Sequence, residues 1–251
     1  MLELNQVHQG DCLELMGEIP DGSVDMCLTS PPYNINLRVH YGKYHTSEIK
    51  ENKSSVKYIN YLDNLSMDEY FNFNKRVLTE CLRVSGVVFY NIQFLTGNKP
   101  ALFKLIGEFS QQIKEFIIWD KVNAEPAMGK NILNSQFEVI LVLEKNYPQS
   151  RQFNIANFKR GCETNLWKIK RGKKPTKIHG AVFPVALASK IIKLFTNEGD
   201  TILDPFSGSG TTGVACKRWN RNFILIEKEP EYCDIARRRL DAEDNLFTEA
   251  K

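Results

Sequence analysis

The residues best suited to chemistry are Ser30, Pro31, Pro32 and Tyr33, which follow the apolar run Val24–Leu28 almost directly. That run predicts a short buried strand, and two successive prolines can continue neither a helix nor a sheet ladder. The chain must therefore leave the sheet in a stiff turn that presents a hydroxyl, the Pro31 carbonyl and an aromatic face. Such a set suits a planar ring with an amino group, stacked on Tyr33 while Ser30 and Pro31 accept its amino hydrogens. An ordinary strand-to-loop turn is the alternative.

A second candidate site lies near the other end of the chain. Thr201–Phe206 predicts a strand, and Ser207–Gly213 predicts a glycine-rich turn that opens a helix. Glycines allow a ligand to approach the backbone closely, and a helix start offers free N–H groups. The next predicted strand, Phe223–Ile226, ends on Glu227, whose carboxylate can accept both hydroxyls of a ribose. The glycines also satisfy the dinucleotide pattern G-x-G-x-x-G, so a nicotinamide or flavin enzyme is an alternative.

Together, these two segments resemble motifs of a known family. Thr29-Ser30-Pro31-Pro32-Tyr33, followed far downstream by Asp204-Pro205-Phe206-Ser207-Gly208-Ser209-Gly210-Thr211-Thr212, resembles the amino-methylating DNA methyltransferases of restriction–modification type. The order is that of the β class, in which the catalytic motif precedes the S-adenosylmethionine loop. The resemblance covers nearly the whole chain and includes His8–Cys12, Trp119–Lys121, Phe137–Leu141 and His179–Pro184.

The resemblance implies an α/β fold, the Rossmann-like S-adenosylmethionine-dependent methyltransferase fold, with a mainly parallel sheet, helices on both faces and an antiparallel end. It implies one catalytic domain over residues 1–251 with permuted motif order. The implied cofactor-binding residues are Asp11, Thr29, His179, Asp204, Pro205, Phe206, Ser207, Gly208, Gly210, Thr211, Thr212 and Glu227. Asp11 could equally be a helix N-cap. Gly180 replaces a proline that relatives commonly have, which weakens the assignment of His179.

The implied reaction is methyl transfer to an exocyclic amino group, with Ser30, Pro31, Pro32 and Tyr33 as the catalytic residues. Such an amine is a poor nucleophile because its lone pair is delocalised into the ring. Accepting its hydrogens favours the pyramidal nitrogen that attacks, which requires positioning and electrostatics but neither a metal nor a covalent cysteine. A duplex base must be flipped out to reach the turn.

Base identity depends on the first residue of the turn. A serine resembles the cytosine-N4 subgroup, whereas adenine-N6 enzymes more often carry Asp or Asn there. We therefore expect a cytosine-N4 methyltransferase, with adenine-N6 as the alternative. From other classes, a catalytically idle nucleic-acid-binding protein and the nicotinamide oxidoreductase are kept as alternatives.

The composition bounds these hypotheses. A chain of 251 residues with 42% hydrophobic and 25% charged residues is typical of a soluble globular protein. No apolar run is long enough to span a membrane, and the start does not resemble a signal peptide. Six cysteines without C-x-x-C spacing predict buried thiols rather than a zinc site, and no other metal site is expected. We expect a cytoplasmic monomer or homodimer that acts on double-stranded DNA and has a possible cognate restriction endonuclease.

The net charge of +3 is unevenly distributed. Residues 151–177 hold nine Lys or Arg and one Glu, a net +8, which leaves −5 on the rest of the chain. A basic block on an acidic body indicates contact with a polyanion, and interleaved Phe153, Phe158 and Trp167 favour nucleic acid over a solvated loop. We predict a basic target-recognition insert over residues 146–177. The expected DNA-binding residues are Arg38, Lys43, Lys159, Arg160, Lys168, Lys170, Arg171, Lys173 and Lys174.

Residues 35–64 show neither a helical nor a strand period, and they combine basic residues with tyrosines. So long a stretch without structure is usually functional or disordered. Because it leaves the catalytic turn directly, we predict a mobile flap over the target base and the DNA backbone. A disordered surface loop is the alternative.

The remaining elements serve as the frame. Ser66–Glu69 predicts a capping box and a helix behind it, and Pro230 predicts the first turn of the last helix. Further predicted elements are the strands at residues 3–7 and Gly86–Asn91, the strands Phe116–Trp119 and Phe137–Leu143 of the antiparallel end, and the helix Val185–Phe195.

Overall fold

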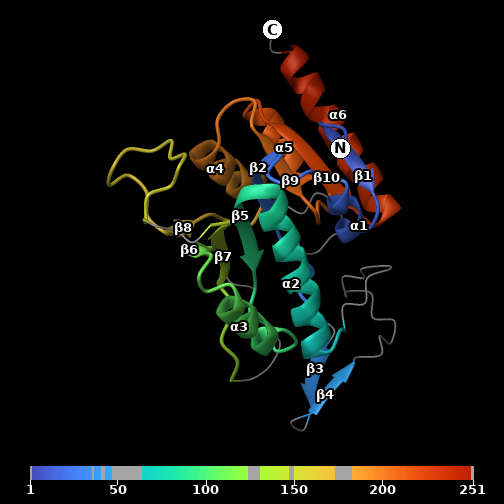
Figure 1. Cartoon of the computed structure of the whole chain (residues 1–251), viewed down its shortest axis with the longest axis vertical. Coiled ribbons are helices and arrows are strands. Elements are labelled where there is room, and N and C mark those ends of the chain that lie inside the picture. The colour runs from blue at the N-terminus through green and yellow to red at the C-terminus, as the bar shows by residue number, and fades with distance from the viewer. Residues whose placement is uncertain are drawn as a thin grey trace.

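The computed structural model of the chain describes residues 2–35, 37–40, 43–46, 64–123, 131–146, 150–172 and 183–249 (Figure 1). An eight-stranded sheet forms its centre. In spatial order the strands are β1 (Gln6–Gln9), β10 (Asn222–Glu227), β9 (Thr201–Asp204), β2 (Val24–Thr29), β5 (Ser85–Ile92), β7 (Phe137–Glu144), β6 (Ile113–Asp120) and β8 (Leu166–Lys168).

The sheet is parallel from β1 to β5 and changes direction at β7. Strand β7 pairs antiparallel with both β5 and β6, and β8 adds to β6 in parallel. The expected mainly parallel sheet with an antiparallel end is therefore confirmed. The carboxyl ends of β2, β9 and β10 lie on one edge, where ligands gather in open α/β sheets.

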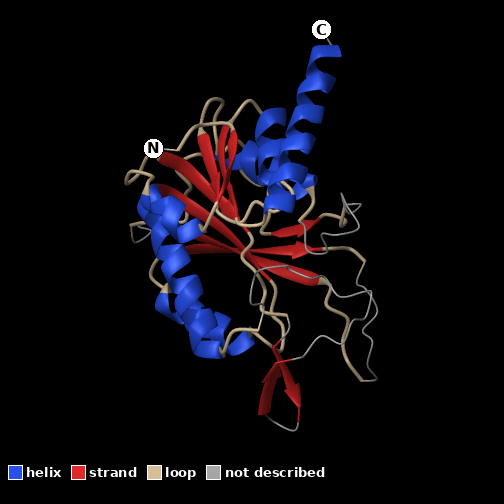
Figure 2. Cartoon of the chain, turned by 90° about the vertical axis from the view of Figure 1, so that its right-hand side faces the viewer, coloured by secondary structure: helices blue, strands red, loops and turns tan. Residues whose placement is uncertain are grey.

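Helices cover both faces of the sheet (Figure 2). One face carries α1 (Cys12–Gly17), α2 (Met67–Val84) and α3 (Lys99–Glu108), and the other carries α4 (Val185–Phe195), α5 (Thr211–Arg218) and α6 (Pro230–Glu249). Side chains along β10 alternate between the two faces and so need cover on both. Ile224 and Ile226 pack with the first group of helices, and Phe223 and Leu225 pack with the second. A strand buried on both faces appears in the sequence as a continuous apolar run.

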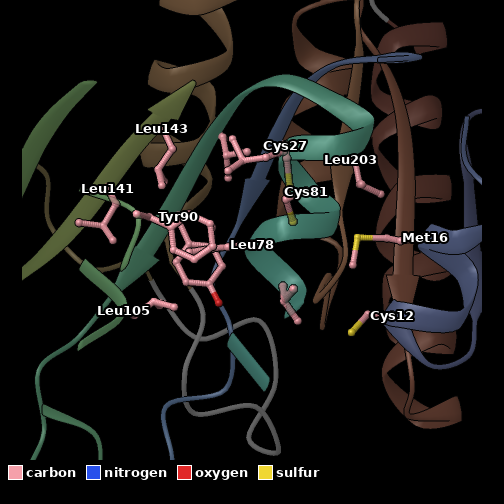
Figure 3. Close-up of a cluster of buried hydrophobic side chains, with 14 of the residues drawn as sticks. Cys12, Met16, Cys27, Leu78, Cys81, Tyr90, Leu105, Leu141, Leu143 and Leu203 are labelled. Carbon is pink, nitrogen blue, oxygen red and sulfur yellow. The ribbon is translucent and has the colours of Figure 1, made fainter. Parts of the chain in front are cut away.

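The expectation of buried thiols is confirmed for five of the six cysteines, and Cys162 is exposed. Figure 3 shows Cys27 of β2 beside Cys81 of α2, in the core cluster that α1 and α2 form against the sheet. Burial raises the pKa of the Cys27 thiol and that of the Cys216 thiol well above the usual range of a cysteine. These side chains therefore act as small apolar residues.

Residues 35–64 contain a hairpin that the sequence pattern did not predict. Strands β3 (Leu37–His40) and β4 (Lys43–Thr46) pair antiparallel as a separate two-stranded sheet. Both views place it at one end of the molecule, beyond the main sheet (Figures 1 and 2). The run Leu-Arg-Val-His does alternate apolar and polar residues, and this strand signal was overlooked.

Element boundaries agree with local chemistry. The predicted capping box is present, because Ser66 Oγ accepts from Glu69 N at 3.3 Å and Glu69 Oε2 accepts from Ser66 N at 2.9 Å. Strand β1 begins at Gln6 rather than at residue 3, because Asn5 adopts a left-handed turn conformation with φ 61°. In the described part of the chain, no helix combines the length and apolar character needed to cross a membrane.

Candidate active site

The turn after β2 is held by side chains from α2 and the start of α3 and by an asparagine of its own. Tyr70 of α2 donates its hydroxyl hydrogen to Pro32 O at 2.8 Å, and the buried Asn98 donates to Tyr33 O at 2.7 Å. Asn34 adopts a left-handed conformation, and its amide nitrogen donates to two further carbonyl oxygens at 2.8 and 2.9 Å. Two prolines stiffen the turn from within, and these bonds fix it from outside.

A buried polar network lies behind the turn. Tyr33 Oη lies 2.6 Å from Ser30 Oγ and donates to Glu138 Oε2 at 3.0 Å. Asn91 Nδ2 donates to Glu138 Oε2 at 2.7 Å and to Tyr33 Oη at 2.9 Å. Lys121 Nζ, fully enclosed, forms an ion pair with Glu138 Oε1 at 3.2 Å. The network joins β2, β5 and the antiparallel strand β7.

The predicted catalytic residues face different surroundings. Ser30 and Pro32 line a cleft at the carboxyl edge of the sheet, whereas Pro31 is buried and is not among the lining residues. Tyr33 is only 8% exposed and also lies outside the lining. The Tyr33 ring is therefore enclosed rather than presented to the cleft as the expected stacking face, and its hydroxyl contacts Ser30, Asn91 and Glu138.

The glycine-rich turn is shaped by two close contacts. Gly210 has φ 78°, and a Cβ there would lie 2.9 Å from Cβ of Ala236 on α6. A Cβ on Gly213 would lie 2.8 Å from Leu225 Cδ1 on β10. Arg239 of α6 donates to the carbonyl and hydroxyl oxygens of Ser209. The glycine-rich turn therefore packs closely against α6 and β10 and still leaves room for a ligand.

Asp204 connects the two candidate sites. Its Oδ1 accepts from Thr29 Oγ1 at 2.7 Å and from Phe206 N at 3.1 Å, and its Oδ2 accepts from Thr212 Oγ1 at 2.5 Å. Burial raises the pKa of Asp204 to about 6, against the opposing effect of these donors. Thr29, Asp204 and Thr212 are all buried, and none of them lines the cleft.

Glu227 stands at the end of β10, beside the glycine turn. Its carboxylate accepts from Gly208 N at 2.8 Å and from Glu229 N at 2.9 Å. Burial is the largest effect on it and raises the pKa of Glu227 above its ordinary value. Gly208 has φ 51°, a conformation that lets its N–H face this carboxylate.

The cleft between the two turns encloses about 740 Å³ of empty space, a volume that includes open solvent. Of the predicted cofactor-binding residues, Asp11, Pro205, Phe206, Gly208 and Glu227 line it. Ser207, Gly210 and Thr211 are buried behind it. Asp11 also caps α1, accepting from Leu13 N at 3.0 Å, so both interpretations of Asp11 describe its position.

Sequence reasoning missed several residues of the cleft wall. Phe73 packs against the core, as its place in the helical period of residues 70–82 predicts, but it also lines the cleft and contacts Phe206, with ring centroids 5.9 Å apart. Tyr232 and Glu229 follow Glu227 closely in the chain, and this short sequence separation was the signal that could have found them. Other missed lining residues are Gly10, Cys12 and Lys228.

The described part of the basic insert projects from the β6–β8 end of the sheet, seen in yellow in Figure 1. Lys159, Arg160, Lys168, Lys170 and Arg171 are exposed there.

The aromatic residues of the insert do not share that exposure. Trp167 is buried, and the Phe153 and Phe158 rings lie 4.8 and 5.8 Å from the Phe195 ring of α4. These aromatic residues pack the insert against the core, so their interleaving with the basic residues is not in itself a sign of contact with nucleic acid.

Some predicted residues cannot be placed. His179, Lys173 and Lys174 lie outside the described residues, and of residues 35–64 the structure describes the backbone of β3, which contains Arg38, and of β4, which contains Lys43. Within the described part, no three His, Cys, Asp or Glu side chains are grouped to hold a metal ion.

Comparison with known sequences assigns the chain to a family. The sequence profile of the DNA methylase family of N6/N4 type matches residues 24–238. Type II methyltransferase M.Cfr9I of Citrobacter freundii is 30% identical over 97% of this chain and 90% of its own length. Type II methyltransferases M2.MboI of Moraxella bovis and M.HinfI of Haemophilus influenzae are 28% and 27% identical, covering 93% and 94% of this chain and 86% and 68% of their own lengths.

Solved structures show the same fold. The PvuII cytosine-N4-specific DNA methyltransferase superposes with a TM-score of 0.70 at 21% identity, over 93% of this chain and 85% of that one. The complex of M1.HpyAVI with S-adenosylmethionine gives 0.64 at 25% identity, over 94% and 99%. The family uses S-adenosylmethionine, which excludes the nicotinamide alternative. The chain therefore belongs to the N6/N4 DNA methylase family and is an S-adenosylmethionine-dependent DNA amino-methyltransferase.

Proposed function

We propose that this protein transfers a methyl group from S-adenosylmethionine to N4 of a flipped-out cytosine in double-stranded DNA. The observation that carries the proposal is the shared cleft, which Ser30 and Pro32 line from one side and Phe206, Gly208 and Glu227 from the other. A methyl donor held by the glycine turn would thus face an amino group held by the catalytic turn.

The cleft suits the cofactor in charge and shape. S-adenosylmethionine carries a sulfonium cation, and three carboxylates, Asp11, Glu227 and Glu229, line the cleft with a single lysine. Phe73, Phe206 and Tyr232 supply apolar walls for a purine ring. Ser207 Oγ is buried, and no hydrogen-bond partner for it lies within the described residues, so it is a donor for the cofactor's own carboxylate.

The residues of the chain then have separate tasks. The cofactor supplies an electrophilic methyl group. Glu227 accepts the ribose hydroxyls, the glycine turn holds the amino-acid end, and Ser30 accepts a hydrogen of the target amine, which favours the nitrogen lone pair that attacks. Neutral Ser30 in place of an acidic residue supports cytosine over adenine as the target.

The decisive experiment is incubation of the protein with DNA and isotopically labelled cofactor, followed by nucleoside mass spectrometry. Labelled N4-methylcytosine is the expected product. Labelled N6-methyladenine would replace the cytosine assignment with the adenine one, and no labelled nucleoside would favour the catalytically idle binding protein.

A Glu227→Gln variant tests the cofactor site. The substitution keeps the shape of the side chain but removes the charge that accepts two hydroxyls, so we expect S-adenosylmethionine affinity to fall by about 1.5–3 kcal/mol, the range for charged hydrogen bonds. Isothermal calorimetry measures this directly. The control is Glu231→Gln, since Glu231 lies four residues further on, in the first turn of α6, but is exposed and outside the cleft lining. Equal affinity of both variants would contradict the assignment.

We propose that the insert over residues 146–177 contacts DNA phosphates. Changing Lys159, Lys168 and Lys170 to Gln should reduce the slope of log K against log salt by roughly 2–3, because each phosphate contact contributes about 0.9. The matched control changes three exposed cations elsewhere, Arg76, Lys193 and Arg238, to Gln. If both triple variants alter the slope equally, the insert is no special DNA surface.

The flap and the biological setting remain part of the proposal. Residues 35–64 leave the catalytic turn directly, and the β3–β4 hairpin lies among them, which supports a cover over the target base. The Type II methyltransferases among the relatives support a role in a restriction–modification system.

A further inference from the structure

The catalytic serine has a hydrogen-bond partner that sequence reasoning did not supply. Four side chains, from the catalytic turn, β5, β7 and the end of β6, converge on the Tyr33 hydroxyl or on the carboxylate that binds it. This group is the Ser30–Tyr33–Glu138 network, supported by Asn91 and Lys121. What matters for catalysis is the direction in which each proton in it points.

The direction is set at Glu138. A carboxylate can only accept, and Glu138 is ion-paired through Oε1 with the buried Lys121 Nζ at 3.2 Å. The Tyr33 hydroxyl lies 3.0 Å from Oε2 and has a single proton. Since a carboxylate is a stronger acceptor than a hydroxyl, that proton belongs to Glu138.

The amide of Asn91 cannot reverse this assignment. Its Nδ2 lies 2.7 Å from Glu138 Oε2 and 2.9 Å from Tyr33 Oη. A flipped amide would set a carbonyl oxygen against a carboxylate oxygen, so both amide hydrogens point into the network. Tyr33 Oη therefore accepts from Asn91 and has no proton left to give to Ser30.

The remaining contact is then determined. Ser30 Oγ and Tyr33 Oη are 2.6 Å apart, and one of them must donate. With the tyrosine proton committed to Glu138, the donor is Ser30, whose other contacts, both with Asn91, are long at 3.4 Å. Lone pairs of Ser30 therefore remain for another partner, and the serine that lines the cleft is presented as an acceptor.

We propose that Glu138, balanced by Lys121, is a positioning residue that acts through Tyr33 to hold Ser30 as a hydrogen-bond acceptor for the target amino group. The inference rests on the proposed function and adds a specificity element to it. An acceptor-only serine favours a base edge with amino hydrogens and disfavours one that presents a carbonyl oxygen at the same place.

The test is a set of combined substitutions. The variant Lys121→Met/Glu138→Gln removes both charges and keeps similar shapes, so no buried charge is left alone. We expect it to bind cofactor and DNA as the wild type does and to slow single-turnover methyl transfer by about 10- to 100-fold, the effect of one charge-assisted hydrogen bond. Tyr33→Phe should cause a similar loss.

Combining the changes separates positioning from general structural damage. If the residues act in series through Tyr33, the triple variant Tyr33→Phe/Lys121→Met/Glu138→Gln should be no slower than Tyr33→Phe or Lys121→Met/Glu138→Gln. In a Ser30→Ala background, Lys121→Met/Glu138→Gln should change the methyl-transfer rate by less than about twofold. Losses that multiply, or a normal rate for the charge-pair variant, would overturn the proposal while leaving the methyltransferase assignment intact.

A measurement independent of activity covers the case in which the wild type transfers no methyl group. The ¹³C resonance of Tyr33 Cζ, assigned through Tyr33→Phe, reports whether the hydroxyl donates to an anion. It should shift in the Lys121→Met/Glu138→Gln protein and stay unchanged in Lys75→Met/Glu108→Gln, where an exposed ion pair is removed. An unchanged Tyr33 resonance in the first variant would refute the proton assignment.

Discussion

Two buried carboxylates lie near the carboxyl end of strand β2, and their surroundings are opposite in kind. Asp204 is surrounded by neutral donors, two threonine hydroxyls and a backbone N–H. Glu138 faces a buried ammonium, that of Lys121. Asp204 belongs to the parallel half of the sheet, beside the glycine-rich turn, and Glu138 to its antiparallel end.

Under the proposed function, the difference follows from what each half binds. The cofactor is a cation, so a carboxylate without a cationic partner beside the glycine turn adds to the negative charge of the cleft instead of cancelling it. The target base is neutral, and a charge-balanced network can orient hydroxyls there without attracting cations. Neutral donors around Asp204 leave its charge incompletely compensated, which agrees with its raised pKa.

The largest expected effect comes from breaking the balanced pair. Lys121→Met alone leaves Glu138 as a buried, unpaired carboxylate and should reduce the free energy of unfolding by about 3–5 kcal/mol. Lys121→Met/Glu138→Gln should recover most of this loss, because no charge then remains. Urea denaturation at pH 7 measures both. A double variant as unstable as the single one would mean that packing, rather than charge balance, dominates the site.

The two halves also differ in how far the sequence predicted them. On the cofactor side the strand, glycine turn and Glu227 are close in sequence, so local pattern sufficed. In the antiparallel half, the segments Trp119–Lys121 and Phe137–Leu141 were recognised as motifs, but nothing local shows that they meet. The register that sets Trp119 opposite Glu138 depends on pairing of β6 with β7, and Tyr33 lies 105 residues from Glu138 in the chain.

The same reason explains what local reasoning missed about the aromatic residues. Phe73 and Trp167 were interpreted from their immediate neighbours, a helical period in one case and a basic run in the other. Burial is set by the opposing surface: Phe206 brings Phe73 to the cleft, and the rest of the core encloses Trp167. Residue types alone did not distinguish these outcomes.

Asp204 offers a second test of the comparison, through pH. Its native pKa of about 6 is higher than the ordinary value of 3.8, so the native state binds the proton more tightly than the unfolded state does. Its contribution to stability is therefore full below pH 4 and is lost as pH rises through 6. Relative to Asp204→Asn, which does not titrate, the wild type should lose about 2–3 kcal/mol between pH 4 and pH 7.

Urea titrations of both proteins at several pH values give this difference directly. The contrast is the double variant Lys121→Met/Glu138→Gln. Relative to the wild type it lacks a charge-balanced pair, whereas Asp204→Asn lacks a carboxylate held by neutral donors. A stability difference between wild type and Asp204→Asn that is independent of pH would contradict the raised pKa of Asp204.

The smallest expected effect concerns the backbone of the glycine-rich turn, at Gly210. Gly210→Ala combines φ 78° with a Cβ 2.9 Å from Ala236 Cβ, so we expect a loss of about 1–3 kcal/mol in stability together with weaker S-adenosylmethionine binding. Gly107→Ala is the control, since a Cβ at this position on α3 meets nothing within 4 Å and alanine favours the helix.

Adding Ala236→Gly to Gly210→Ala separates the two causes. It removes the clash with α6 but leaves the left-handed backbone, so only the steric part of the loss should return. Cofactor titration by calorimetry and thermal melting of the same samples then show whether the glycine turn is limited by its contact with α6 or by its own conformation. Full recovery of both readouts would show that the contact dominates. No recovery would mean that position 210 requires glycine because of φ alone. The packing of the glycine-rich turn against α6 would then contribute nothing to stability or to cofactor affinity.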